Sequence, residues 1–297
     1  MANLGGGFDT LGVAVELYLR VRILDVRPGD EPRLRVVTST PPVIGENAVE
    51  RAFALLAERT GVRPPAVDVD VHSDIPMAAG LGSSAAATVA GLRVFERVTG
   101  LLPDSTLLAA AAALEGHADN AAPALFGGFI SVMERSDGDP IALRWTWPEE
   151  LRLIVATPSV GLATAKARAA LPASLPRKDA VFNLQRVLTL VHALQSRQYD
   201  RIRDGVVDRW HQPARAPLVP LLDEVLAIDD EDVLGAFLSG AGPSVAIIAR
   251  REFARIEQLL RSKYERSGCP ATIRTLGVHQ SEAMTAAPAA SVHGRSA

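Results

Sequence analysis

The most informative stretch of this chain is IPMAAGLGSSAAATVAGL, at residues 75–92. Gly80 and Gly82 permit a tight turn and let the backbone approach a ligand closely. From Ser83 onward the pattern is typical of a long helix, whose first amide groups have no partners inside the helix. A phosphate placed there would meet free N–H donors and the positive end of the helix dipole. The stretch therefore favours a phosphate-binding loop.

Other interpretations of this loop have to be weighed. A Walker A loop needs a lysine after its glycines, and none follows here. Gly80, Gly82 and Ala85 satisfy the loose dinucleotide pattern G-x-G-x-x-A, but a turn and another helix come next, at residues 101–114, where a Rossmann unit needs a second strand. A glycine-rich helix entry that serves only tight packing stays open as the structural alternative. The loop alone does not decide between packing and function.

Length and composition exclude several classes of protein. With 297 residues, of which 48% are hydrophobic, the chain can bury a core in one large or two ordinary domains. Acidic and basic residues number 34 and 31, without the basic face of a nucleic-acid binder. The longest apolar run, residues 107–114, is too short for a membrane span, and no export signal is visible. A single cysteine, Cys269, favours a reducing, cytoplasmic location.

Hydrophobic periodicity predicts an α+β fold. A period of two over residues 13–23 and again over 67–71 indicates half-buried strands, and helical spacing over 47–60 ends at Gly61. In the second half, a strand at 151–156 precedes an amphipathic helix. Its apolar stripe is expected to face the core, and it consists of Val181, Leu184, Val187, Leu188, Val191 and Leu194.

A turn-rich segment at residues 136–150 sets the predicted domain boundary. We expect domains at 1–150 and 151–278, followed by a small, polar tail at 279–297 that is expected to be disordered. Strands and helices mixed within two blocks favour α+β over a doubly wound sheet.

Two further segments accompany the glycine loop. The chain carries ANLGGGFDTLG at residues 2–12 and LSGAGPSVA at 238–246. In this order, the three segments resemble the three motifs of the GHMP kinase family, and the resemblance covers residues 2–277. It implies a two-domain architecture, with a ribosomal-protein-S5-domain-2-like N-terminal domain and a ferredoxin-like α+β sandwich as the C-terminal domain. It also implies ATP as phosphoryl donor and Mg2+ as the metal.

Three more segments narrow the resemblance within the family. Residues 114–128 (LEGHADNAAPALFGG), 163–172 (ATAKARAALP) and 210–220 (WHQPARAPLVP) are similar to segments of homoserine kinases. The resemblance implies that Mg-ATP phosphorylates the hydroxyl of L-homoserine, a step of threonine biosynthesis, and it is compatible with a homodimer. Another small alcohol as substrate, or an inactive GHMP-fold protein that senses a ligand, stays open as an alternative.

The resemblance also implies roles for individual residues. Homoserine offers a carboxylate and an ammonium, which suit two arginines, with forked donors, and an aspartate. The substrate would be bound by Asn3, Asp9, Asn120, Arg168 and Arg215, and the catalytic residues would be Asn120, Thr164 and Arg168. The nucleotide would contact Asn47, Pro76, Gly80, Leu81, Gly82, Ser83, Ser84 and Ala85, and Mg2+ would be held by Ser84 and Glu115.

Plainer interpretations exist for several of these residues. Arg168 and Arg215, each taken singly, are explained equally well as surface charges. Asn47 is explained equally well as a helix N-cap, and Glu115 as a solvated helix end. His117 is expected to fix the loop that presents Asn120. The resemblance implies direct transfer without a strong general base.

The chain departs from the family pattern at its start. Gly6 stands where the family usually has proline, and the strand that precedes this motif in the family has no counterpart before Ala2. We therefore expect a chain that starts late, with Asn3 and Asp9 on a frayed terminus.

Overall fold

The computed structural model describes residues 1–28, 33–43, 45–136 and 138–280. Within these residues the strands form three sheets, with the orders β1-β2-β6-β7, β3-β5-β4 and β11-β8-β10-β9. The mixed α and β content agrees with the expected fold class. Among the described residues, no helix combines the length and the apolarity needed to cross a membrane.

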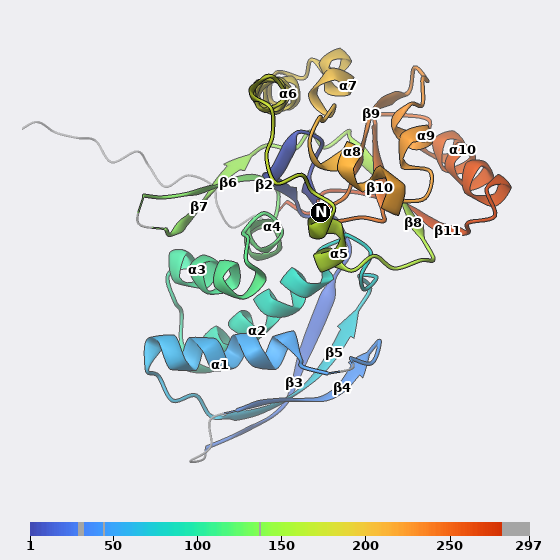
Figure 1. Cartoon of the computed structure of the whole chain (residues 1–297). Coiled ribbons are helices and arrows are strands. Elements are labelled where there is room, and N and C mark those ends of the chain that lie inside the picture. The colour runs from blue at the N-terminus through green and yellow to red at the C-terminus, as the bar shows by residue number, and fades with distance from the viewer. Residues whose placement is uncertain (29–32, 44, 137, 281–297) are drawn as a thin grey trace, which may run out of the picture.

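The first half of the chain places helices on one face of the β3-β5-β4 sheet (Figure 1). Antiparallel β3 and parallel β4 flank the central β5. Phe53 of α1 and Phe95 of α2 meet edge to face in the core, with ring centroids 5.3 Å apart. The elements of this half are β1 (Ala2–Asn3), β2 (Gly7–Val13), β3 (Leu19–Arg27), β4 (Leu34–Thr40), α1 (Ala48–Thr60), β5 (Ala66–Ser73), α2 (Ser83–Thr99), α3 (Asp104–Glu115), α4 (Ala121–Phe126), β6 (Phe129–Glu134) and β7 (Pro140–Trp145).

The second half is built on the antiparallel β11-β8-β10-β9 sheet. Its elements are β8 (Arg152–Pro158), α5 (Thr164–Ala169), α6 (Arg177–Ser196), α7 (Ile202–Gly205), α8 (His211–Arg215), α9 (Leu222–Leu226), β9 (Val233–Leu238), β10 (Val245–Ala249), α10 (Phe253–Arg266) and β11 (Ala271–Leu276). One buried cluster joins Leu11 and Val13 of the first half to Leu153 and Ile248 of the second. The predicted division at residue 150 stays a prediction.

The single strand expected over residues 13–23 is two strands in different sheets. β2 ends at Val13 and β3 begins at Leu19. The link between them bends because Leu17 N donates to Val15 O over 2.7 Å, while Val15 forms an isolated bridge with Val278. The apolar residues continue to alternate although the chain passes from one sheet to another. Periodicity alone cannot show such a change of sheet.

The apolar stripe expected on α6 faces the core only in part. Leu194 is buried, but Val181, Leu184 and Leu188 are 46%, 65% and 71% exposed. The N-terminal half instead turns Asn183 inward, because its amide donates to Asp208 over 2.6 Å. The expectation of a continuous core stripe was therefore wrong.

Both ends of the described chain are paired. Met1 is 5% exposed and β1 pairs with β2, so the expectation of a frayed terminus around Asn3 was wrong. Gly240 N also donates to Ala2 O over 3.0 Å. At the other end, His279 N donates to Ala14 O over 2.8 Å, and the remainder of the expected tail, 281–297, lies outside the described residues.

Candidate active site

A cavity of about 340 Å³ lies where the N-terminal loop, the glycine loop, the start of α5 and the 238–246 segment meet. It brings together most of the residues that the sequence singled out. Its lining includes Asn3, Asp9, Gly80, Gly82, Ser83, Ser84, Ala85, Glu115, Asn120, Thr164, Arg168 and Arg215.

The glycine loop is shaped by the second half of the chain. Gly80 has φ +75°, and a Cβ there would lie 2.3 Å from Ser239 O, so only glycine fits. The hydroxyl of Ser239 donates to Gly80 O over 2.7 Å. Gly82, at φ +78°, is the N-cap of α2 and provides no side-chain cap. The first amides of α2 therefore remain available to an anion in the cavity.

Glu115 ends α3 beside the start of α2. Its Oε1 accepts hydrogen bonds from Ser84 Oγ over 3.0 Å and from Thr88 Oγ1 over 2.7 Å. The side chain is thus held against the glycine loop, which an ordinary solvated helix end would not require. Thr88, fully buried, was not singled out from the sequence, although it stands one helical turn after Ser84.

Asp9 and Arg168 form a two-pronged ion pair across the cavity. Arg168 Nη1 and Nη2 donate to the two Asp9 oxygens over 3.0 and 2.8 Å. The hydrogen bonds that Arg168 donates to Asp9 raise the pKa of Arg168 above its ordinary value, against the effect of burial. The two side chains are 34% and 38% exposed, so a ligand in the cavity can reach both. Asn3 Oδ1 accepts from Asp9 N over 3.1 Å and fixes the loop, in which Asp9 has φ +51°.

Arg215 is only 1% exposed, which rules out a surface charge. It donates to Gly240 O over 2.9 Å and to Ala167 O over 3.2 Å, and within the described residues it forms no hydrogen bond to a carboxylate. Burial, and then the positive charge of Arg168, lower the pKa of its guanidinium. A buried cation beside a cavity favours an anionic ligand there.

Phe8 organises the cationic side of the cavity. The guanidinium carbons of Arg168 and Arg215 lie 5.6 and 5.3 Å from its ring centroid. His211 stacks on the same ring at 5.4 Å and bonds Gly5 O over 2.8 Å through Nε2. Neither Phe8 nor His211 was assigned a role from the sequence, although both lie inside the quoted motifs.

His117 supports the loop before α4. Its Nδ1 lies 2.7 Å from Asp119 Oδ1, and this hydrogen bond raises the pKa of His117 despite partial burial. Asn120 Nδ2 donates to the same oxygen over 3.4 Å, which agrees with a supporting role for His117. Asn120 Oδ1 is buried without a hydrogen-bond partner in the described part of the chain. It is therefore the atom of this loop best placed to accept a hydrogen bond from a ligand.

Three residues assigned to the nucleotide do not line this cavity, and their assignment stays a prediction. Asn47 caps α1, with Oδ1 accepting from Val49 N over 3.0 Å. Pro76 precedes the loop without lining the cavity, and Leu81 is buried and lines a neighbouring groove.

The arrangement offers two chemical environments in one cavity. Helix amides and Glu115 suit a phosphate chain with its counter-ion, whereas Asp9, Arg168 and Arg215 suit a small molecule with both charges. The two environments meet at Asn120, which also abuts Gly82.

Comparisons with known proteins agree with this geometry. Residues 47–128 match the family model "GHMP kinases N terminal domain", and residues 190–266 match "GHMP kinases C terminal". Homoserine kinase of Deinococcus radiodurans is 41% identical over 82% of this chain and 80% of its own length. Homoserine kinase of Thermus thermophilus is 38% identical over 84% of each chain. The crystal structure of homoserine kinase from Cytophaga hutchinsonii superposes with a TM-score of 0.82 at 28% identity, covering 94% of this chain and 92% of that one.

Proposed function

The chain belongs to the GHMP kinase family, and we propose that it is a homoserine kinase, which transfers the γ-phosphoryl group of ATP to the hydroxyl of L-homoserine. The products are O-phospho-L-homoserine, a precursor in threonine biosynthesis, and ADP. One observation carries the proposal: the glycine-rich start of α2 and the Asp9–Arg168 ion pair, with Arg215 beside it, line the same small cavity. The identity to proteins named homoserine kinase, at 38% and 41% over most of the chain, supports the choice of substrate.

The triphosphate is proposed to lie along residues 80–85, against the first amides of α2. Among the described residues, no group of three or more His, Cys, Asp or Glu side chains could hold a metal ion. Magnesium, however, is usually held by one or two carboxylates together with substrate phosphates and water. The Glu115 carboxylate and the Ser84 hydroxyl fit that mode, and when bound there the ion would neutralise charge on the phosphate oxygens. Thr88 would then orient Glu115.

The amino acid is proposed to lie on the cationic side of the cavity. Asp9 and Arg168 carry charges opposite to those of the zwitterionic amino acid. The ammonium of the substrate would therefore bind Asp9, and the carboxylate of the substrate would bind Arg168. Arg215 adds a second cation with little freedom to move, because two carbonyls fix its fork. Thr164 and Asn120 are proposed to border the point of transfer.

Transfer itself is proposed to depend on positioning rather than on a strong base. Phosphoryl transfer has a loose transition state, and alignment with charge neutralisation supplies most of the rate. His117 would be a poor base because its hydrogen bond to Asp119 favours the protonated ring. Aspartate 9 is already engaged by Arg168.

A substrate panel tests the proposal directly. The 297-residue chain is supplied with Mg-ATP and L-homoserine, L-threonine, mevalonate or galactose, and ADP release is followed by a coupled assay with 31P NMR of the product. We expect O-phospho-L-homoserine, with kcat/KM for homoserine the highest of the panel. A higher value for another alcohol would reject the substrate, and no turnover with any of them, despite ATP binding, would favour a ligand sensor.

The proposal includes a cytoplasmic location, because ATP is plentiful there and the lone thiol of Cys269 has no disulfide partner. A homodimer stays a prediction.

A further inference from the structure

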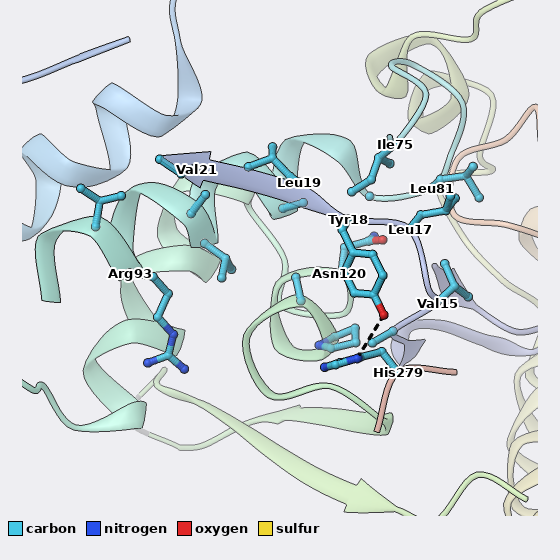
Figure 2. Close-up of a pocket in the computed structure, with 18 of the residues that line it drawn as sticks. Val15, Leu17, Tyr18, Leu19, Val21, Ile75, Leu81, Arg93, Asn120 and His279 are labelled. Carbon is cyan, nitrogen blue, oxygen red and sulfur yellow. Dashed lines mark hydrogen bonds between the residues drawn. The ribbon is translucent and has the colours of Figure 1, made fainter. Parts of the chain in front are cut away.

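The fold holds Arg215 in a way that leaves part of its guanidinium to a ligand. An arginine side chain has five N–H donors. Nε donates to Ala167 O, and Nη1 donates to Gly240 O and lies 3.3 Å from His211 Nδ1. Within the described residues, Nη2 forms no hydrogen bond. Arg215 lines the candidate active site and not the larger apolar groove that also reaches Asn120 (Figure 2), so the two donors of Nη2 are left to an anion in the active site.

The contact between Arg215 and His211 fixes the tautomer of the imidazole. Arginine can only donate, so His211 Nδ1 must accept with its lone pair. The ring proton is then on Nε2, which lies 2.8 Å from Gly5 O and donates to it. The ring also stacks on Phe8, with centroids 5.4 Å apart, and this contact fixes its plane. One neutral ring thus connects the guanidinium of Arg215 to the backbone of the N-terminal loop.

A protonated His211 is the alternative, because the buried carboxylate of Asp208 lies nearby. Asp208 Oδ2 is 3.5 Å from His211 Nε2, which is farther than the 2.8 Å to Gly5 O. The carboxylate is also engaged by three other donors, namely Asn183 Nδ2, Trp210 N and Gln212 N. A proton on Nδ1 would face Nη1 of Arg215, donor against donor and cation against cation, away from solvent. The geometry therefore favours the neutral ring.

The charges that face His211 have opposite effects on its pKa. Burial lowers the pKa most, and the positive charge of Arg215 lowers it further. Asp208, Asp9 and the hydrogen bond to Gly5 O raise it. Because burial is the largest of these causes, the pKa of His211 lies below its ordinary value, which agrees with a neutral ring at neutral pH.

We propose that His211 is a positioning residue for the substrate: as the neutral Nε2–H tautomer, it holds Arg215 so that Nη2 binds the carboxylate of the amino acid. The inference rests on the proposed function, because it takes homoserine as the ligand. His211 does not line the cavity, so it acts only through Arg215.

Two substitutions separate the two hydrogen bonds of the ring. The amide of asparagine can place its oxygen where Nδ1 stands, and the amide of glutamine can place its nitrogen where Nε2 stands. His211→Asn therefore still accepts from Arg215 but loses Gly5 O, whereas His211→Gln keeps Gly5 O and leaves Arg215 without this acceptor.

We expect His211→Gln to raise the KM for homoserine at least about tenfold, with kcat changed less than about threefold. His211→Asn should raise this KM at least about threefold less than His211→Gln does. The matched control is His192→Gln, the same change at an exposed histidine of α6, which should leave both constants unchanged. Equal KM values for the two His211 variants would overturn the inference.

A double variant tests whether His211 acts through Arg215. In the Arg215→Ala background, adding His211→Gln should change the KM for homoserine by less than about twofold, because the group that it positions is already gone. A further rise of about tenfold would show that the two residues act independently, and it would overturn the inference.

Nitrogen-15 NMR of the imidazole rings adds a measurement that needs neither substrate nor a stable Gln variant. The signals of His211 are assigned as those missing from the His211→Asn spectrum, and at neutral pH they should show a protonated Nε2 and an unprotonated Nδ1. A protonated Nδ1 in a chain that phosphorylates homoserine would overturn this inference alone. A parent chain without homoserine turnover would instead reject the proposed function, and this role of His211 with it.

Discussion

Glu115→Gln separates a metal-binding role from a structural one. The amide oxygen of glutamine can still accept from Ser84 and Thr88, so both hydrogen bonds survive without their charge assistance. A neutral hydrogen bond contributes about 1 kcal/mol and a charge-assisted one about twice that, so the free energy of unfolding should fall by at most about 2 kcal/mol. For a chain of this size, that corresponds to a fall in Tm of about 4 °C. The loss of the carboxylate should lower kcat at least about 100-fold, equivalent to about 2.7 kcal/mol in the activation barrier.

The assay measures Tm, kcat and the Mg2+ concentration at half-maximal rate for three chains: the parent, Glu115→Gln and Thr88→Val. Thr88→Val removes one hydrogen bond to Glu115 but keeps its charge, so it should cost stability and leave kcat within about threefold. Glu115→Gln should require more Mg2+ at half-maximal rate. The reasoning is refuted if Glu115→Gln keeps its turnover, or if both variants lose stability and kcat in parallel.

Three further predictions follow from the site and the N-terminus. Arg215→Ala should raise the KM for homoserine at least about tenfold, with little change in the KM for ATP. It should also lower Tm, because Gly240 O and Ala167 O lose their hydrogen-bond donor. An equal effect on both KM values would assign Arg215 to the fold. Gly80→Ala should lower kcat/KM for ATP at least about tenfold, since the new Cβ would clash with Ser239 O. Gly61→Ala is the control: Gly61 has a similar φ but open space around it, so kcat/KM for ATP should not change. Equal losses in the two variants would reject the contact with Ser239 as the cause. The buried Met1 nitrogen has a pKa of about 6, so between pH 6 and pH 8 the folded chain has lost an α-amino proton that the unfolded chain still carries. The free energy of unfolding should therefore rise by about 2 kcal/mol from pH 6 to pH 8, as measured by urea unfolding of protein that retains Met1. The Nα-acetylated protein should lack this rise, and identical pH profiles for the two proteins would contradict the prediction.

Local signals predicted the elements around the site well. The N-cap Asn47, the left-handed Gly61 after α1 and the start of α2 at Ser83 depend on neighbouring residues, and the structure has them where the sequence placed them. The motifs also predicted most of the residues that line the cavity, because each motif is a short loop whose conformation depends mainly on its own sequence.

Long-range features could not be predicted from the same signals. The alternation through Val15 and Leu17 continues across a change of sheet, because burial on either sheet favours the same residue types. The burial of Arg215 depends on carbonyls of Ala167 and Gly240, which lie 48 and 25 residues away along the chain. Because backbone carbonyls accept its hydrogen bonds, no acidic residue in the sequence indicates that this guanidinium is buried.

The hydrogen bond from Ser239 to Gly80 has a consequence for how the protein folds as it is synthesised. This hydrogen bond joins residues 159 positions apart, and the hydrogen bond from Asn3 Nδ2 to Gly240 O spans 237 positions. Contacts of such separation form late, after the entropy of closing a long loop has been overcome. A nascent chain therefore exposes the complete glycine-rich segment before the residues that shape it, Ser239 and Gly240, have been made. If the proposed ATP site is correct, ATP would stabilise only molecules whose two halves have already come together.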